Sequence, residues 1–405
     1  MKALILLPTG MADLPVAALD DRTPLDAAQT PHLDRLAKTG RLGLVRPVPD
    51  ELEVSSVAAL LSLLGYDPRR EVASRGGLEA LGLGIELEPD DVVFRMNLAS
   101  TFREHLVDFQ AGPIRPEEAR VLVDTLQEQL GGDRLSFHPG LGYRCLMVVH
   151  DAAELDVETT PPALAQGLPL EDHLPRGTHG PWLTEVMEEA ALVLAPHDVN
   201  QVRLDLGENA ADRIWLWGQG GPPVIEPFAL RHDRSLAVVG AVPLVRGLGH
   251  AVRATVPEVP RATGDADTDY EAKLEAALAL LDDHDVVLLH VAAANEACHQ
   301  TDVQAKVRVL EDVDRRVVGP ALAALERRLD TRLLVTTDHM TSALVELKTS
   351  TEHVPFGLWG SGVAGGRQTR FTEEEAATGD LLVDPGHHLL ELLLKPVPSG
   401  PAVGA

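Results

Sequence analysis

Apolar residues along the chain follow two kinds of spacing. Short runs rich in leucine or β-branched residues, bounded by turn residues, predict buried strands at residues 3–7, 286–291 and 333–336. Between such runs, apolar positions recur three and four residues apart, as on the buried face of an amphipathic helix. Strands that alternate with helices in this way are typical of a mostly parallel sheet covered on both faces. The pattern therefore predicts an α/β fold.

The segment TPHLDRLAKTG, residues 30–40, carries start and stop signals of a helix. Thr30 stands at the N-cap position, Pro31 lies in the first turn and Gly40 follows the last turn. Leucines three residues apart give this helix one apolar face, so it is expected to pack on the sheet.

A second helix is predicted to begin at Ser56, in the run SSVAALLSLLG, and to end at Gly65. The free backbone N–H groups and the positive dipole end of a helix start favour an anion. Ser56 is therefore a candidate for a phosphorylated nucleophile. A serine at a helix start also serves as an N-cap, and this second interpretation applies to both Ser55 and Ser56.

The spacing of the elements changes in the middle of the chain. There we expect shorter strands and intervening helices, the strands at 144–149 and 213–217 and the helices at 116–130 and 183–194. This change predicts a second domain inserted into a first one.

The predicted core domain comprises residues 1–70 and 231–405, and the inserted domain comprises residues 71–230. The proline-rich segment 159–169 is expected to be a surface loop of the inserted domain, and residues 396–405 a frayed tail.

Composition restricts the class of protein. The chain has 405 residues, 45% of them hydrophobic, which is long enough for two cores. The formal net charge of -27 argues against nucleic acid or an anionic membrane as a partner, because phosphate recognition uses clustered Lys and Arg. Two cysteines, Cys145 and Cys298, imply no disulfide framework. Since no apolar run is long enough for a signal peptide or a membrane span, we expect a cytoplasmic protein.

Two predicted strands end in residues that bind metals. The run VVLLHVAAANEACHQ places Asn295 and His299 four residues apart at a strand-to-helix corner, and LLVTTDHM places Asp338 and His339 after the other strand. Imidazole and carboxylate groups aimed into one cleft are typical of metalloenzymes. The sequence thus predicts a metal site, with Asn295 where a carboxylate would be expected.

Several further motifs occur in a fixed order along the chain. The full set is LILLPTGMAD, TPHLDRLAKTG, GYDP, EALGLGIELEPDDVVFRMN, ATGDADTDYEAK, HVAAANEACH and TTDH. In the order and spacing of these motifs, the chain resembles the archaeal-type cofactor-independent phosphoglycerate mutases of the alkaline phosphatase superfamily. The resemblance implies an alkaline-phosphatase-like core with an inserted phosphomutase-type cap. It also implies interconversion of 3-phosphoglycerate and 2-phosphoglycerate in glycolysis or gluconeogenesis through phospho-Ser56, with divalent manganese or magnesium ions and a small anionic phosphorylated substrate.

The resemblance also implies a set of metal ligands. The first ion is assigned to positions that read Thr9, Ser56, Asp338 and His339 in this chain. The second ion is assigned to positions that read Asn295, His299 and Thr349. Thr9 and Asn295 stand where the family has Asp, and Thr349 stands where it has His.

These substitutions leave Asp338 as the single carboxylate of the implied set, and neutral oxygens contribute no charge to balance two dications. Replacement ligands are conceivable, and they are Glu352, His353, Asp265, Asp267 and Glu296. The favoured interpretation of each is instead a solvated loop residue. His387 and His388 are instead expected to flank a packing helix.

Other reactive positions of the family are also substituted. Where the family has an Asp directly after the nucleophile and a His three residues later, this chain has Val57 and Leu60. Where the family has a Lys two residues after the strand histidine, this chain has Ala292. The basic positions of its cap read Phe109, Gln110, Pro113 and Trp217. Arg95, Asn97 and Arg144 are retained, and each is either a substrate-binding residue or a structural polar residue.

Three functions therefore stay open. The first is the mutase reaction through Ser56. The second is a non-catalytic paralogue that binds a ligand or a protein partner through the same cleft or cap. The third is a one-metal phosphohydrolase or phosphotransferase that uses Ser56, Asp338 and His339 on a less charged substrate.

Overall fold

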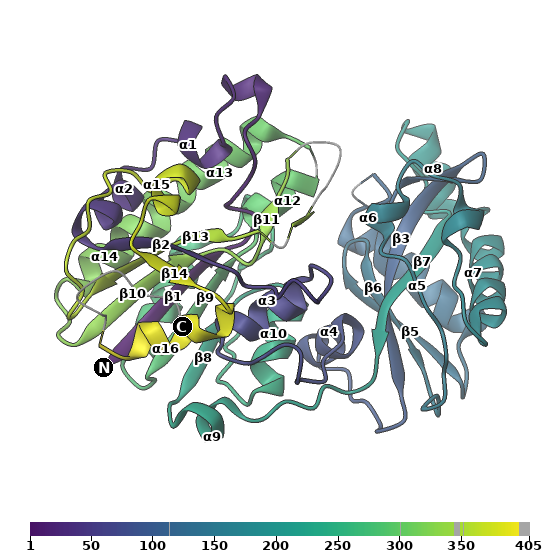
Figure 1. Ribbon diagram of the computed structural model, residues 1–405. Coiled ribbons are helices and arrows are strands. Elements are labelled where there is room, and N and C mark those ends of the chain that lie inside the picture. The colour runs from purple at the N-terminus through teal and green to yellow at the C-terminus, as the bar shows by residue number, and fades with distance from the viewer. Residues whose placement is uncertain (113, 300, 344–348, 351, 397–405) are drawn as a thin grey trace. The chain divides into compact units, whose positions relative to one another are not determined.

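The computed structural model describes residues 1–405 with two kinds of exception (Figure 1). Residues 113, 300, 344–348, 351 and 397–405 are not described at all, and residues 299, 349 and 350 are described without their side chains. The predicted ligands His299 and Thr349 therefore have side chains outside the described set, and Pro113 lies outside it as well.

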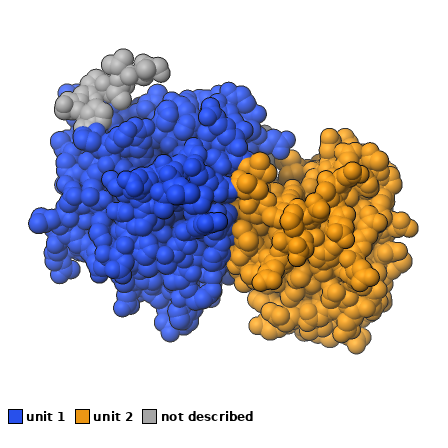
Figure 2. Space-filling model, turned by 90° about the horizontal axis from the view of Figure 1, so that it is seen from below, with its two compact units in different colours: residues 1–71, 225–405 blue, residues 72–224 orange. Residues whose placement is uncertain are grey.

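The chain forms two compact units, and the second is inserted into the first (Figure 2). The first comprises Met1–Glu71 and Ile225–Ala405, and the second comprises Val72–Val224. The second segment of the core domain was predicted from the sequence to begin at residue 231, but it begins at Ile225. Residues 225–230 join the first unit because Tyr66 Oη donates to the Glu226 carbonyl (2.8 Å) and the Phe228 N–H donates to the Val252 carbonyl (2.9 Å).

A seven-stranded sheet forms the centre of the first unit (Figure 1). Its strands in spatial order are β14 (Leu381–Val383), β2 (Arg41–Val45), β13 (Val354–Gly360), β10 (Thr331–Thr336), β1 (Lys2–Pro8), β9 (Val286–Val291) and β8 (Leu236–Val239). Strand β13 is antiparallel to both neighbours, and the other neighbouring pairs are parallel. The predicted α/β class with a mostly parallel sheet is confirmed.

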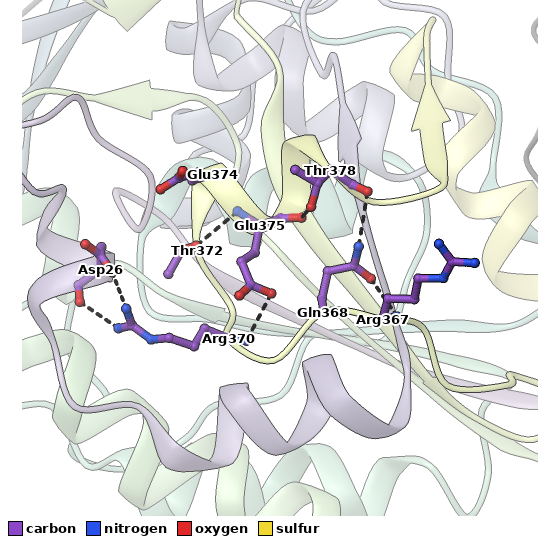
Figure 3. Close-up of a pocket in the computed structure, with 8 residues that line it drawn as sticks. All are labelled: Asp26, Arg367, Gln368, Arg370, Thr372, Glu374, Glu375 and Thr378. Carbon is purple, nitrogen blue, oxygen red and sulfur yellow. Dashed lines mark hydrogen bonds and ion pairs between the residues drawn. The ribbon is translucent and has the colours of Figure 1, made fainter.

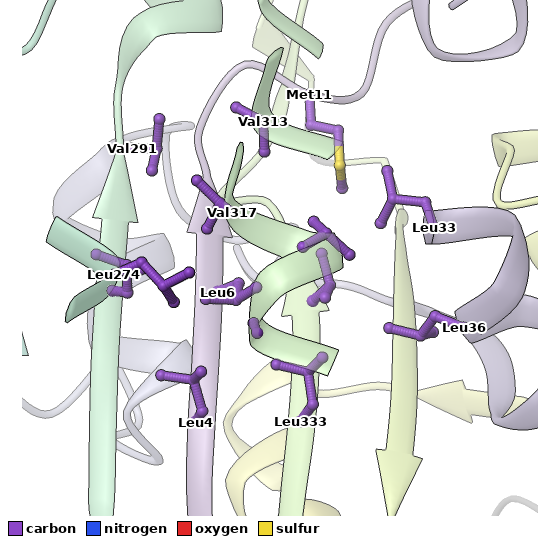
Figure 4. Packing of buried hydrophobic residues seen from close by; sticks show 14 of the residues in the cluster. Leu4, Leu6, Met11, Leu33, Leu36, Leu274, Val291, Val313, Val317 and Leu333 are labelled. Atoms are coloured by element: carbon purple, nitrogen blue, oxygen red, sulfur yellow. The ribbon is translucent and has the colours of Figure 1, made fainter. Parts of the chain in front are cut away.

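One face of this sheet carries the main hydrophobic core (Figure 4). The helices that supply it are α2 (Pro31–Thr39), α11 (Tyr270–Leu280), α13 (Val303–Val313), the π-helical η3 (Asp314–Val318) and α14 (Gly319–Leu325). Leu4 and Leu6 of β1 point into it beside Leu333 of β10, because alternate strand residues share a face. Burial of each such leucine contributes roughly 1.5–3 kcal/mol.

The opposite face carries α3 (Ser56–Leu63), α10 (Pro243–Ala251) and α16 (Leu389–Leu394). His290 of β9 alternates with Leu289 and Val291 of the main core, so its side chain lies on this second face. A Cβ on Gly240, in the turn after β8, would lie 3.4 Å from the His290 Cβ.

Local signals set the helix ends much as predicted. Thr30 precedes α2 as its N-cap, although its side chain makes no capping hydrogen bond. Ser55 is the N-cap of α3 and accepts the Ala58 N–H (3.2 Å), which leaves Ser56 as the first helical residue. His387 and His388 lie in the short η4 (Gly386–His388) directly before α16, as expected.

The second unit is built on an antiparallel sheet. Its strands are β4 (His105–Asp108), β3 (Val92–Phe102), β6 (Arg144–Val149) and β5 (Leu135–Leu141) in that order, with β7 (Arg213–Gly220) also paired to β3. Its helices are α4 (Arg75–Leu83), α5 (Pro116–Leu130), α6 (Pro162–Ala165), η2 (Leu170–His173), α7 (Gly180–Leu194) and α8 (Asp198–Asp205). The interpretation of 159–169 as a loop was incomplete, because α6 starts at Pro162, a residue suited to the first helical position.

The remaining elements of the first unit are short. They are η1 (Ala17–Leu19), α1 (Pro24–Ala27), α9 (Phe228–His232), α12 (Ala293–His299), β11 (Met340–Thr341), β12 (Thr349–Ser350) and α15 (Glu373–Ala377). Across the described residues, no helix is both long and apolar enough to cross a lipid bilayer.

Candidate active site

The candidate site lies where β1, β9 and β10 end. These strands are parallel neighbours, so their carboxyl ends meet at one edge of the sheet, the usual place for a site in such a fold. Thr9 follows β1 directly, and Asp338 and His339 follow β10. Asn295 lies in α12, just after β9. The backbone thus gathers residues that are far apart in the sequence.

His339 contacts both Ser56 and Asp338. The Nε2 atom of His339 lies 3.3 Å from Ser56 Oγ and 3.3 Å from Asp338 Oδ2. Asp338 and His339 are buried, and Ser56 is partly exposed. A partly exposed hydroxyl beside an imidazole and a carboxylate is a suitable place for a nucleophile.

The other ring nitrogen of His339 is also held. Its Nδ1 atom lies 3.0 Å from Thr341 Oγ1, and Thr341 belongs to the short strand β11. A ligating histidine whose second nitrogen is hydrogen-bonded has a fixed ring orientation, and Nε2 is then directed at its target.

A buried ion pair supports this segment from behind. Lys306 of α13 lies 2.8 Å from Asp13 Oδ2, and neither side chain is exposed. Lys306 also donates to the Thr341 carbonyl (2.9 Å), and Asp13 accepts the Ala343 N–H (3.1 Å). Both charged groups thereby fix the backbone that follows His339. Sequence reasoning missed this pair, since 293 residues separate its members.

Thr9 is bound to a histidine that sequence reasoning treated as part of a strand. Its Oγ1 atom lies 3.2 Å from His290 Nε2 and 3.5 Å from the Val291 carbonyl. Burial, with a smaller effect of Lys273, lowers the pKa of His290 to about 3, and Asp338 opposes this shift. His290 is therefore neutral at physiological pH.

The buried Nδ1 atom of His290 has no hydrogen-bond partner among the described residues. An unpaired acceptor costs less than an unpaired donor here, so we place the ring proton on Nε2, where it is donated to Thr9. The Thr9 hydroxyl then donates to the Val291 carbonyl. Thr9 is committed to this chain of hydrogen bonds.

Gly10 brings the turn after β1 close to α12. Its φ of 80° is in the left-handed region, and a Cβ there would lie 2.5 Å from the Asn295 backbone nitrogen. Any larger residue would push Thr9 and Asn295 apart.

The suggested replacement ligands differ in their surroundings. His353 pairs with Asp384, with 3.7 Å between Nε2 and Oδ2. Asp265, Asp267 and Glu352 are exposed, and Glu296 is buried in α12.

The described residues fit one divalent cation. Ser56 and Asp338 offer oxygens and His339 offers Nε2, and each of the two oxygens lies 3.3 Å from that Nε2 atom. Thr9 and Asn295 offer neutral oxygens. Within the described part of the chain, no three His, Cys, Asp or Glu side chains come together as a metal cage.

The predicted substrate residues Arg95 and Asn97 lie on β3 of the second unit, in a buried network. Arg95 Nη1 donates to both carboxylate oxygens of Glu79, at 2.7 and 2.5 Å, and its Nε donates to Asn97 Oδ1 (3.1 Å). Although burial acts to raise the pKa of Glu79, the guanidiniums of Arg95 and Arg75 hold it below its usual value.

Aromatic residues surround this network. Trp217 Nε1 donates to Asn97 Oδ1 (3.0 Å), and the Arg75 guanidinium lies 5.0 Å from the Trp217 ring centroid. The Arg144 guanidinium lies 4.6 Å from the ring centroid of Tyr143. Three arginines and one carboxylate leave an excess of positive charge at this place in a strongly acidic chain.

A pocket of about 550 Å³ lies elsewhere on the first unit (Figure 3). Its lining residues are Asp26, Arg367, Gln368, Arg370, Thr372, Glu374, Glu375 and Thr378. Arg370 donates to Asp26, and Glu375 accepts the Arg370 N–H (3.3 Å). None of the predicted site residues lines it.

Comparisons with known proteins agree over nearly the whole chain. A family model described as 2,3-bisphosphoglycerate-independent phosphoglycerate mutase matches residues 37–200. A protein of Geobacter sulfurreducens named as a probable mutase of this kind is 41% identical and covers 97% of this chain and 100% of its own length. The mutase of Methanosarcina barkeri is 38% identical, with 98% and 100% covered.

Two solved structures are similar over the same extent. A protein from Pyrococcus horikoshii has a TM-score of 0.78 at 30% identity, covering 100% of this chain and 99% of that chain. A cofactor-independent phosphoglycerate mutase from Thermoplasma acidophilum has a TM-score of 0.57 at 27% identity, covering 97% and 99%.

Proposed function

Since the chain belongs to the 2,3-bisphosphoglycerate-independent phosphoglycerate mutase family, we propose that it interconverts 3-phosphoglycerate and 2-phosphoglycerate through phosphorylated Ser56. The observation that carries this proposal is the contact of Ser56 Oγ with His339 Nε2 at 3.3 Å, beside Asp338. The substrate is a small phosphorylated anion, and the cellular setting is cytoplasmic glycolysis or gluconeogenesis.

The family uses divalent metal ions, and we propose manganese or magnesium here, held by Ser56, Asp338 and His339. When bound, such an ion neutralises phosphoryl oxygens and lowers the pKa of the serine hydroxyl. Ser56 would accept the phosphoryl group from one hydroxyl of the substrate and return it to the other. Its place as the first residue of α3 directs the positive end of the helix dipole toward a phosphorylated side chain.

The second unit supports substrate binding by its charge. Arg95, Asn97 and Arg144 are the proposed substrate residues, and Arg75 adds a fourth polar group to them. Because Glu79 and Asn97 already orient Arg95, its guanidinium is held in one position before any ligand arrives. A preorganised cation loses little entropy when it binds an anion.

One observation favours a second candidate function. Thr9, at a position where the family has an acidic metal ligand, is hydrogen-bonded to neutral His290. With a smaller negative charge, the site would hold one cation instead of two. A one-metal phosphohydrolase or phosphotransferase, or a non-catalytic paralogue that binds a ligand or protein partner, would retain the same scaffold.

The test is turnover of 3-phosphoglycerate by the purified chain with excess manganese, together with its metal content. We expect turnover that Ser56→Ala abolishes and that Ser62→Ala preserves. Ser62 is the matched control because it lies in the same helix, and its buried Oγ has no hydrogen-bond partner among the described residues. Absence of turnover with metal bound would favour the one-metal enzyme, and absence of both would favour the non-catalytic paralogue.

A further inference from the structure

A serine, a histidine and an aspartate form a hydrogen-bonded row in the second unit, and none of the three has been assigned a role above. Ser136 Oγ lies 3.0 Å from His150 Nε2. His150 Nδ1 lies 3.1 Å from Asp91 Oδ1. This is the connectivity of a Ser-His-Asp triad, in which one histidine nitrogen faces the nucleophile and the other faces the carboxylate.

The sheet itself aligns the three side chains. Val148 of β6 pairs with Ser136 of β5 on one side and with Val93 of β3 on the other. His150 lies two residues after Val148, and Asp91 lies two residues before Val93. Because side chains alternate between the two faces of a strand, all three functional side chains lie on one face. Ser136 lies in β5, Asp91 directly precedes β3 and His150 directly follows β6, so three neighbouring strands of one sheet hold the triad (Figure 1).

The aspartate is held in place, and the serine is accessible. The Asp91 side chain is only 4% exposed, and its second oxygen accepts the Glu88 N–H (3.0 Å). The His150 side chain is 34% exposed, and Ser136 is partly exposed. A fixed buried carboxylate with a histidine and a serine at the surface is the arrangement that an external substrate requires.

The hydrogen bonds fix the positions of the protons. An ionised Asp91 only accepts, so neutral His150 carries its proton on Nδ1 and accepts at Nε2. The Ser136 hydroxyl must then donate to His150, which is the direction that activates it for attack.

A second histidine completes the network. His138 Nε2 lies 2.9 Å from Ser136 Oγ. Because the Ser136 proton points to His150, His138 donates to the serine oxygen. Burial, with a smaller effect of His150, lowers the pKa of His138 and keeps this ring neutral. Its N–H therefore helps to hold the Ser136 oxygen in position.

Apolar side chains lie on the same face of this sheet. Val93, Leu146 and Val148 form a buried core there, and the partly exposed Leu83, Ile85 and Leu87 pack against it. The exposed hydrocarbon surface of these three residues suits a short hydrocarbon group better than a charged one.

We propose that Ser136, His150 and Asp91 form a second nucleophilic site, which hydrolyses esters with a small apolar acyl group. Ser136 Oγ bonds to the acyl carbon while the ester C–O bond breaks, and His150 passes the serine proton to the departing alcohol. Water then cleaves the acyl-serine with His150 as base, and the proton returns to Ser136. The net reaction converts an ester and water into a carboxylic acid and an alcohol.

The test uses the full chain with a fluorophosphonate probe and with p-nitrophenyl acetate. We expect the probe adduct to map to Ser136 by peptide mass spectrometry, and Ser136→Ala to remove both the adduct and the burst of p-nitrophenol. His150→Gln should slow labelling of Ser136 roughly 10²-fold, the usual effect of a lost general base. Labelling is read on Ser136 itself, so the result does not depend on mutase turnover.

Controls separate the site from general reactivity and from misfolding. Ser62→Ala removes a serine of the other unit and should leave labelling of Ser136 unchanged. Asp91→Asn should slow labelling as His150→Gln does. If it unfolds the chain, as judged by circular dichroism, the partly exposed His150→Gln variant still decides the outcome. An unlabelled Ser136, or equal labelling rates in wild type and His150→Gln, would overturn the proposal.

Discussion

Lys306 and Asp13 form an ion pair at 2.8 Å in the first unit, and neither side chain reaches solvent. Through Lys306 the pair also binds the carbonyl of Thr341, whose hydroxyl contacts His339. A charge pair that is costly to bury is thus linked through Thr341 to His339, the histidine that contacts the candidate nucleophile Ser56.

Lys306→Met is expected to lower the free energy of unfolding by about 3–5 kcal/mol, because Asp13 would remain buried and unpaired. Urea denaturation monitored by circular dichroism measures this change. Lys395→Met is the control, since Lys395 pairs with Glu391 at the surface and such a pair contributes less than about 1 kcal/mol. Equal effects of the two substitutions would show that the buried pair adds little.

Thr341→Val should weaken manganese binding about 10–100-fold by removing the nearer of the two partners of His339 Nδ1, the other being the Met340 carbonyl, because partners of a ligating histidine fix its orientation. Thr341→Ser keeps the hydroxyl and should bind as the wild type does. Calorimetric titration with manganese gives both affinities. If the valine variant binds like the serine variant, the backbone alone orients His339.

Sequence periodicity predicted the regular elements well. Strands 286–291 and 144–149 and the helix 116–130 have the predicted bounds, because strong apolar patterns end there at turn residues or at Pro116. Parallel strands meet at one edge, so the approach of Asp338 to the end of β1 also followed from the pattern. The metal-binding and phosphoryl-transfer roles stay predictions.

The polar pairs could not be predicted from local patterns. His290 lies within an apolar strand and resembles a core residue, and its bond to Thr9 joins residues 281 apart in the chain. Ser136 and Asp91 are likewise unremarkable in sequence, since strand pairing alone brings them to His150. Such contacts depend on register and side-chain direction, which apolar periodicity does not specify.

Lys273 makes the free energy of unfolding depend on pH in the alkaline range. Burial lowers its pKa from 10.5 to about 8, with Asp265 acting against this shift. Between these values the unfolded chain binds one more proton than the folded chain, so unfolding free energy rises with pH through this window. The gain is roughly 3 kcal/mol.

Lys273→Met should remove this rise, and the difference between variant and wild type should shrink as pH increases from 8 toward 10.5. Denaturation at several pH values measures it. Glu271→Gln, a nearby substitution at the surface of the same helix, should preserve the wild-type slope over this range. Parallel pH profiles for wild type and Lys273→Met would contradict the assignment.

Restoring carboxylates at Thr9 and Asn295 should raise the manganese content from one to two ions per chain. Asp338 is the single described carboxylate in the contact of His339 with Ser56. Two added carboxylates would supply two negative charges, which balance the two positive charges of a second dication. An Asp at position 9 can also accept the Nε2 proton that His290 now donates to Thr9. Metal analysis after gel filtration compares Thr9→Asp/Asn295→Asp with the neutral control Thr9→Asn. One ion in both variants would mean that charge does not limit occupancy.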